Sequence, residues 1–142
     1  MVEYQLETID GDSVIFRGQL ISHAESPIGF SDDCQRHFSL DLYVTETSGF
    51  VPVITYTTNS PDERSGRISE IVEIAADVES CFFVFEPEEL LADREQLTRD
   101  ELDVFKQLSN RIQSVYEKLA YAVLDQLDLY LQQQAPVEKT GL

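Results

Sequence analysis

The feature that most constrains the fold is a long, uninterrupted helical pattern near the C-terminus. Residues 99–133 contain no proline or glycine, and apolar residues recur there at steps of three and four. Such spacing places the apolar side chains on one face of an α-helix. Thr98 and Glu101 stand at the spacing of a capping box, which marks where a helix begins. We therefore predict a helix from residue 99 to about residue 133.

The apolar face of this predicted helix repeats every seven residues along two seams, as in a coiled coil. The helix would be roughly 50 Å long, and its C-terminal half is expected to need a partner beyond the sheet. The apolar face either covers the chain's own sheet or pairs with a second copy to give a homodimer. The residues assigned to this interaction face are Phe105, Leu108, Ile112, Val115, Leu119, Val123, Leu127 and Tyr130.

Alternation of polar and apolar residues predicts a β-meander before the helix. Four segments are predicted to be strands. They span residues 2–8, 14–22, 36–45 and 50–58. The first alternates as a half-buried strand does, whereas the second has apolar residues on both faces, as in a central strand or one covered on both sides. Gly11 and Gly49 lie in the predicted turns, and Gly49 is expected to take the left-handed conformation. Pro52 lacks an N–H, which favours an edge position or a bulge.

The segment between the meander and the long helix is less regular. Residues 67–76 fit a helical face almost as well as a strand, so their structure stays open. Residues 81–85 form an apolar, β-prone run that we predict to be a buried strand ending before Pro87. Residues 88–96 are predicted to form a short helix.

These segments together predict one α+β domain over residues 1–133, followed by a disordered tail over residues 134–142. The domain is expected to be an antiparallel β-meander of about four to five strands packed against a long C-terminal α-helix. A chain of 142 residues is long enough to bury one core of normal size.

The charge is strongly negative and unevenly distributed. The chain has 27 acidic and 10 basic residues, a net charge of −17. Residues 60–103 carry a net charge of −10, whereas residues 104–142 are neutral overall. This balance repels phosphate, so we expect no direct binding to nucleic acid or to anionic membranes. The sequence shows no basic leader and no apolar run of membrane length, so we expect a cytoplasmic protein. The negative charge favours a basic protein partner.

No pattern in the sequence predicts a catalytic, cofactor-binding or metal-binding site. Cys34 and His37 have the spacing of half a zinc site and His23 is near in sequence, but a second ligand pair is missing. Cys81 has no basic residue near it in the sequence that would activate its thiol. Glycine-rich phosphate loops and a nucleophile elbow are absent from the sequence.

We therefore expect a non-enzymatic acidic interaction module. It would act as an adaptor, a chaperone-like factor or an inhibitor, by binding a basic partner or by mimicking DNA. The alternative is a small-molecule-binding domain or a small enzyme with a pocket between the sheet and the helix. Polar groups such as Tyr43, Tyr56 and His37 would line that pocket.

Overall fold

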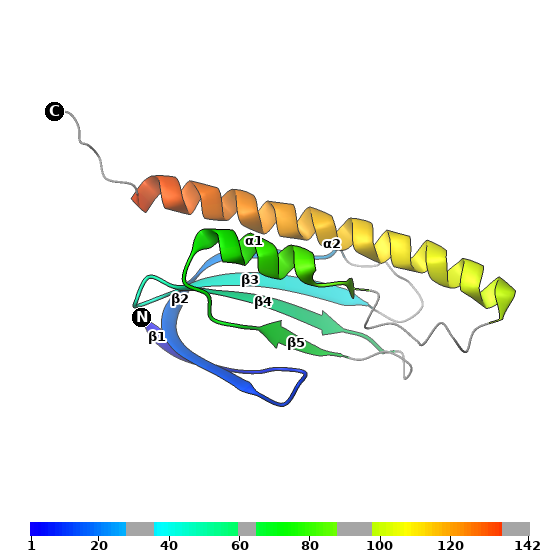
Figure 1. Ribbon diagram of the computed structural model, residues 1–142, viewed down its shortest axis with the longest axis horizontal. Helices are drawn as coiled ribbons and strands as arrows, with labels where there is room; N and C mark the ends of the chain where they lie inside the picture. The colour runs from blue at the N-terminus through cyan, green and yellow to red at the C-terminus, as the bar shows by residue number, and fades with distance from the viewer. Residues whose placement is uncertain (28–35, 60–64, 88–97, 135–142) are drawn as a thin grey trace.

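The computed structural model describes residues 1–27, 36–59, 65–87 and 98–134. The elements, in chain order, are β1 (Val2–Glu7), β2 (Ser13–Glu25), β3 (His37–Thr45), β4 (Phe50–Thr57), β5 (Gly66–Ser69), α1 (Ala75–Val84) and α2 (Arg99–Gln134). The strands form one antiparallel sheet in the order β1-β2-β3-β4-β5, and both helices lie on the same side of it (Figure 1). The predicted α+β meander with a long C-terminal helix is confirmed. The short helix predicted at 88–96 lies outside the described residues. Of the tail predicted at 134–142, Gln134 is instead the last residue of α2, and the rest lies outside the described residues.

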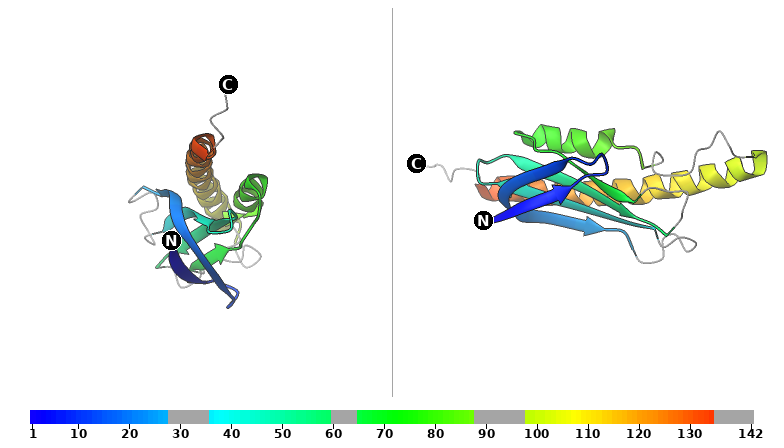
Figure 2. Two further views of the ribbon diagram at one scale, coloured as in Figure 1. Left: turned by 90° about the vertical axis from the view of Figure 1, so that its left-hand side faces the viewer. Right: turned by 90° about the horizontal axis from the view of Figure 1, so that it is seen from below.

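The sheet curls because β2 is long and bends between its two partners. Its first half pairs with β1 and its second half with β3, and the register shifts between Leu20 and Ser22. The extra residue, Ile21, makes a β-bulge, which reverses the side of the sheet that the following side chains face. The curl brings the β1–β2 turn to β5, where the Ile9 N–H donates to the Arg67 carbonyl at 2.7 Å (Figure 2).

Apolar clusters cover both faces of the curled sheet. The larger cluster lies between the sheet and the two helices, and its fully buried members include Phe38, Leu40, Leu42, Val78, Phe82, Ile112, Ala120 and Val123. The smaller cluster fills the inner side of the curl, with Phe16, Val51 and Val53 buried beside Tyr4, Leu6, Val14 and Tyr43. Burial on both faces explains why β4 is apolar along most of its length.

The long helix α2 begins at its predicted cap. The Glu101 N–H donates to Thr98 Oγ1 and the Thr98 N–H donates to Glu101 Oε1, both at 3.2 Å. Val123 and Leu127, in the C-terminal half, are buried in the larger cluster. The first turns of α2, coloured yellow, extend past the end of the sheet (Figures 1 and 2). The end that leaves the sheet is thus the N-terminal one, and not the C-terminal half as expected.

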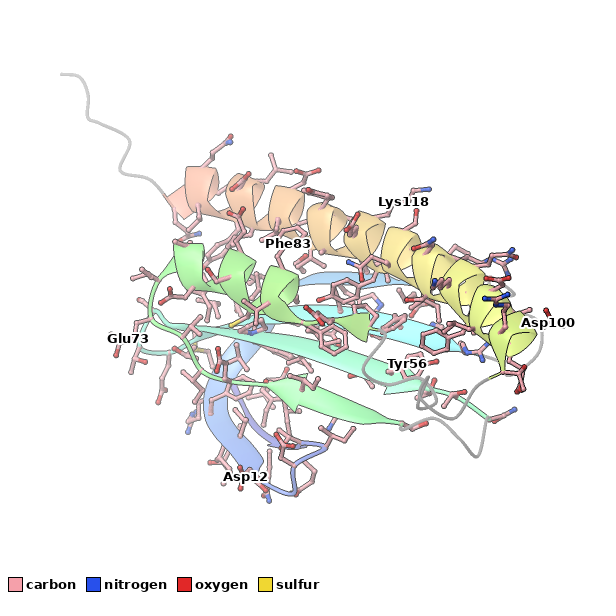
Figure 3. All side chains as sticks on the ribbon, turned by 45° about the vertical axis from the view of Figure 1, so that its right-hand side comes forward. Asp12, Tyr56, Glu73, Phe83, Asp100 and Lys118 are labelled. Carbon is pink, nitrogen blue, oxygen red and sulfur yellow. The ribbon has the colours of Figure 1, made fainter. Side chains whose placement is uncertain are left out.

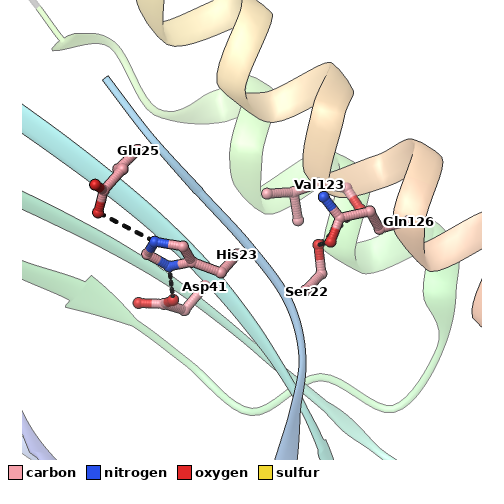
Figure 4. A network of polar contacts seen from close by, with 6 residues as sticks. All are labelled: Ser22, His23, Glu25, Asp41, Val123 and Gln126. Carbon is pink, nitrogen blue, oxygen red and sulfur yellow. Dashed lines mark hydrogen bonds and ion pairs between the residues drawn. The ribbon is translucent and has the colours of Figure 1, made fainter. Parts of the chain in front are cut away.

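A buried hydroxyl fixes the position of α2 over β2. Ser22 Oγ donates to Gln126 Oε1 at 2.9 Å and lies 3.3 Å from the Val123 carbonyl oxygen (Figure 4). Ser22 is 3% exposed, so its hydroxyl needs a protein partner. This contact sets the register of the helix on the sheet.

The prediction of a buried strand at residues 81–85 is wrong, because residues 81–84 form the last turn of α1 and Phe85 is its C-cap. Val78 and Phe82, four residues apart, face the core, whereas Phe83 and Val84 are exposed. Residues four apart lie on the same face of a helix, whereas a strand would bury every second residue, so this pattern of burial indicates a helix. The fifth strand is instead β5, which lies at the start of the segment that the sequence pattern left open.

The two predicted turns use their glycines differently. Gly11 has a positive φ of 90°, as an Asp-Gly turn requires. In the β3–β4 turn Ser48, with a φ of 68°, takes the left-handed conformation that was expected of Gly49. A Cβ on Gly49 would lie 3.0 Å from the Val72 carbonyl oxygen, so Gly49 allows a close approach of two backbone segments.

Candidate functional site

A groove opens between α1 and the β4–β5 edge of the sheet, where the pairing of these two strands is interrupted. The pairing register of β4 with β5 would place Pro52 opposite Glu70. Pro52 has no N–H to donate at this position, so the ladder stops and β5 ends at Ser69. The Ser69 hydroxyl donates instead to the Pro52 carbonyl at 3.0 Å. The prediction that Pro52 lies at an edge or a bulge is wrong, because β4 is an inner strand and its register with β3 and β5 does not shift at Pro52.

The groove is mainly apolar and has a polar rim. Its volume is about 550 Å³, within the range of ligand-binding hollows in proteins. The apolar lining residues are Pro52, Ile54, Ile68, Val72, Val84 and Phe85. The polar ones are Ser69, Glu70, Asp77, Ser80 and Cys81. Among the described residues that line the groove there is no lysine, arginine or histidine, so every charge on this lining is negative.

The acidic rim belongs to a longer acidic segment of the chain. Residues 68–86 contain five acidic residues and no lysine, arginine or histidine. They are Glu70, Glu73, Asp77, Glu79 and Glu86, and all five are exposed. Only Glu70 and Asp77 line the groove. Carboxylates beside a low-dielectric apolar wall concentrate a negative potential, which raises the local concentration of cationic groups.

Cys81 and Glu70 join the two sides of the groove. The Cys81 thiol on α1 donates to Glu70 Oε1, 2.7 Å away at the end of β5. Partial burial, and then this carboxylate, raise the pKa of the Cys81 thiol to about 12. The thiolate is the nucleophilic form of cysteine, so this thiol is a poor nucleophile at neutral pH.

We expect the Cys81 thiol to react with iodoacetamide at about pH 8 about a hundredfold more slowly than an unperturbed cysteine, because a roughly thousandfold lower thiolate fraction is partly offset by the greater nucleophilicity of a more basic thiolate. The measurement uses a Cys34→Ser background, so that only Cys81 reports. Glu70→Gln is expected to speed the reaction about tenfold, because it removes the carboxylate that opposes ionisation. Glu73→Gln, three residues away, is the control and should leave the rate unchanged. Equal rates for all three proteins would contradict the Cys81–Glu70 contact.

A second polar cluster lies on the face of the sheet away from the helices. His23 Nδ1 is 2.5 Å from Asp41 Oδ1, and His23 Nε2 is 3.2 Å from Glu25 Oε2 (Figure 4). The Asp41 contact is the largest cause that raises the pKa of His23; partial burial opposes it and Glu25 supports it. The imidazolium therefore ties β2 to β3 across the sheet. Two carboxylates that share one histidine form an ion-pair cluster, and these contacts are explained by the pairing of β2 with β3.

The His23 cluster predicts a pH dependence of stability. Because the folded pKa lies above the ordinary value of 6.5, its contribution is fully present below pH 6.5 and is lost as pH rises through the folded pKa. The His23 side chain is 43% exposed, so the contribution should be about 0.5 kcal/mol. We expect His23→Gln to cost that amount at about pH 5.5 and nothing at about pH 9, in urea unfolding. The difference should shrink in an Asp41→Asn background; an unchanged difference would contradict the ion pair.

The residues predicted to interact through the long helix divide into two sets. Those buried in the chain's own core are Ile112, Leu119, Val123 and Leu127. Those that are partly buried are Phe105, Leu108, Val115 and Tyr130. Of the partly buried residues, Leu108, Val115 and Tyr130 also pack against this core. Seven of the eight residues assigned to an interaction face therefore pack on the chain's own fold.

The polar residues suggested for a pocket beneath the long helix do not come together. Tyr56 is buried in the cluster below the helices, whereas Tyr43 packs against the cluster on the opposite face. Cys34 lies outside the described residues, so the zinc half-site is not placed. Among the residues that the structure describes, no three histidine, cysteine, aspartate or glutamate side chains are grouped to hold a metal ion.

The groove itself was not predicted from the sequence. Its signals were Pro52 and the acidity of residues 60–103, but only the fold brings the two together.

No helix in the described part of the chain is long and apolar enough to cross a membrane. Comparison with known proteins gives no match to a family model, to a curated protein or to a solved structure.

Proposed function

We propose that this protein is a non-enzymatic interaction module whose groove between α1 and the β4–β5 edge binds a basic, apolar segment of a partner protein. The supporting observation is the pairing of an apolar lining with charges of a single sign, Glu70 and Asp77. Apolar side chains of the partner would be removed from water when they enter the groove. Its arginine or lysine side chains would pair with the two carboxylates. The net charge of −17 would speed the encounter with such a partner.

The apolar lining favours a peptide over other partners of an acidic protein. A surface that mimics DNA needs only carboxylates placed like phosphates, whereas six of the groove's lining residues are apolar. The proposal also places the partner in the groove rather than on α2, because residues such as Ile112 and Val123 of a homodimer face are already buried.

The test is the binding of a fluorescein-labelled peptide of alternating arginine and leucine, followed by fluorescence anisotropy. We expect Glu70→Gln to weaken binding about threefold to fivefold, the effect of one partly exposed charge pair. The matched control is Glu73→Gln, which removes an identical charge outside the groove and should change affinity less than about twofold. A peptide with glutamate in place of arginine should not bind. Equal losses in the two variants would show a general charge effect and overturn the proposal.

A small-molecule ligand is the second candidate for the same groove, since its volume of about 550 Å³ fits one. The polar groups that would orient such a ligand are Glu70, Asp77, Ser80 and Cys81. A thermal-shift screen against cationic amphiphilic molecules tests this candidate, because a ligand that binds only the folded state raises Tm. A rise in Tm that Glu70→Gln abolishes, together with no peptide binding, would favour this candidate.

A further inference from the structure

We infer that the partner segment is an extended basic peptide that runs from the α1 groove, over the end of β5, into a second hollow beside the β1–β2 turn. The inference rests on the proposed function. It adds that the partner segment is extended and that it contacts both hollows.

The second hollow adjoins the groove directly. Its volume is about 500 Å³, and it is lined by Thr8, Asp10, Asp12, Ser13, Val14, Ile15, Ile68, Ser69, Glu70 and Ile71. Three of these residues, Ile68, Ser69 and Glu70, also line the groove. The two hollows are therefore separated only by the end of β5, and a ligand in one can continue into the other.

The chemistry of the lining continues across this boundary. The charged residues of the second hollow are Asp10, Asp12 and Glu70, and none is basic. Figure 3 shows Asp12 at the tip of the β1–β2 hairpin, on the side of the sheet away from α2. Two large apolar side chains in the hollow are more than half exposed, Ile15 at 57% and Ile71 at 51%. Exposed apolar side chains within a carboxylate rim suit a ligand with both apolar and cationic groups.

The backbone of β5 favours an extended ligand over a helical one. The Arg67 carbonyl accepts from the Ile9 N–H, so the backbone groups of Arg67 face away from β4. Backbone groups of residues two apart in a strand point to the same side, so those of Ser69 face the same way, at the second hollow. The Arg67 carbonyl is already paired with Ile9, so the backbone groups that an extended segment can pair with are those of Ser69. A helix uses its own backbone groups internally and cannot continue the sheet in this way.

Alternation of side chains in an extended segment also fits the two hollows. Successive side chains of a strand point to opposite sides, so apolar and basic residues can alternate between the lining and the carboxylate rim. The partner that this surface fits is therefore a protein segment in which arginine or lysine alternates with large apolar residues.

Two labelled peptides of identical composition test the conformation. In one peptide arginine and leucine alternate; in the other the same residues are spaced at three and four positions, as in an amphipathic helix. We expect the alternating peptide to bind the full chain at least about fivefold more tightly in fluorescence anisotropy. Tighter binding of the helical peptide would overturn the extended conformation.

A pair of variants tests the extent of the surface. Asp10→Asn removes a carboxylate from the second hollow, and Glu3→Gln removes an exposed one from β1 outside it. We expect Asp10→Asn to weaken the alternating peptide about threefold and Glu3→Gln to have less than about a twofold effect. If Glu70→Gln weakens binding and Asp10→Asn does not, this inference fails while the proposed function stands. If neither variant weakens binding, both fail.

Discussion

Replacing Tyr116 with alanine is expected to lower the free energy of unfolding by about 4 kcal/mol, the largest effect of any single change considered for this protein. The Tyr116 ring is 1% exposed and lies between the rings of Phe38, at 5.7 Å, and Phe85, at 5.2 Å. Its hydroxyl donates to the Phe82 carbonyl at 2.7 Å, in the last turn of α1 where helical carbonyls lack internal partners. One side chain therefore holds α1, α2 and the sheet together.

Two further variants separate the contributions of Tyr116. Tyr116→Phe keeps the ring and leaves the buried Phe82 carbonyl unpaired, so it should cost about 1–2 kcal/mol. Tyr121 is the matched control: it is a tyrosine of the same helix, 59% exposed, with one ring contact to Phe83. Tyr121→Ala should cost less than about 1 kcal/mol in urea unfolding. Equal costs at Tyr116 and Tyr121 would contradict the packing of α2 on α1.

Replacing Gly18 with alanine is expected to lower the free energy of unfolding by about 3 kcal/mol. Gly18 lies in β2 where this strand pairs with both β1 and β3. A Cβ at this position would fall 2.2 Å from the carbonyl oxygen of Val44. That oxygen belongs to the backbone of an inner strand, so it cannot move aside without disturbing the ladder.

Gly66→Ala is the comparison that isolates this effect. A Cβ on Gly66 would lie 2.8 Å from Cγ1 and Cδ1 of Ile9, which a rotamer change can move, and 2.9 Å from Ile9 Cβ, which moves only with the β1–β2 turn. A shift of this turn disturbs fewer backbone contacts than a shift of an inner strand. We expect this substitution to cost about 1 kcal/mol, well below the cost at Gly18. The free energies of unfolding come from urea titrations of both variants, with equal slopes for a two-state comparison. A Gly18→Ala protein as stable as the Gly66→Ala protein would mean that β2 and β3 pair less closely at this point.

The strands and the long helix could be predicted because their side chains follow one clear period. In β3 the residues Phe38, Leu40 and Leu42 alternate with polar ones, and all three are fully buried. The capping pair of Thr98 and Glu101 fixed the start of α2, because this signal is local and needs no tertiary information.

The structure of residues 81–85 could not be predicted, because a short apolar run is equally consistent with a buried strand and a helix. The residues that reveal a helix are Val78 and Phe82, of which Val78 lies before the run. Their spacing of four becomes meaningful only when the exposure of Phe83 and Val84 is known. β-propensity favoured a strand there, and tertiary packing decided otherwise.

The candidate site depends on tertiary placement that no local pattern contains. Pro52 favoured an edge position or a bulge, which the structure does not show, and nothing in the sequence paired this residue with Glu70. The acidity of residues 60–103 was visible, yet only the packing of α1 decides that Glu70 and Asp77 line the groove while Glu73 and Glu79 do not.

The most direct test of the central claim, that the acidic groove is the binding site, is an NMR titration of the isotope-labelled protein with the alternating arginine–leucine peptide. We expect the largest amide shifts at residues that line the groove, with Ile68, Glu70 and Cys81 among them. Amides on the exposed side of α2, such as those of Glu117 and Tyr121, should shift little. Shifts concentrated on α2, or spread evenly over all acidic surfaces, would contradict the claim.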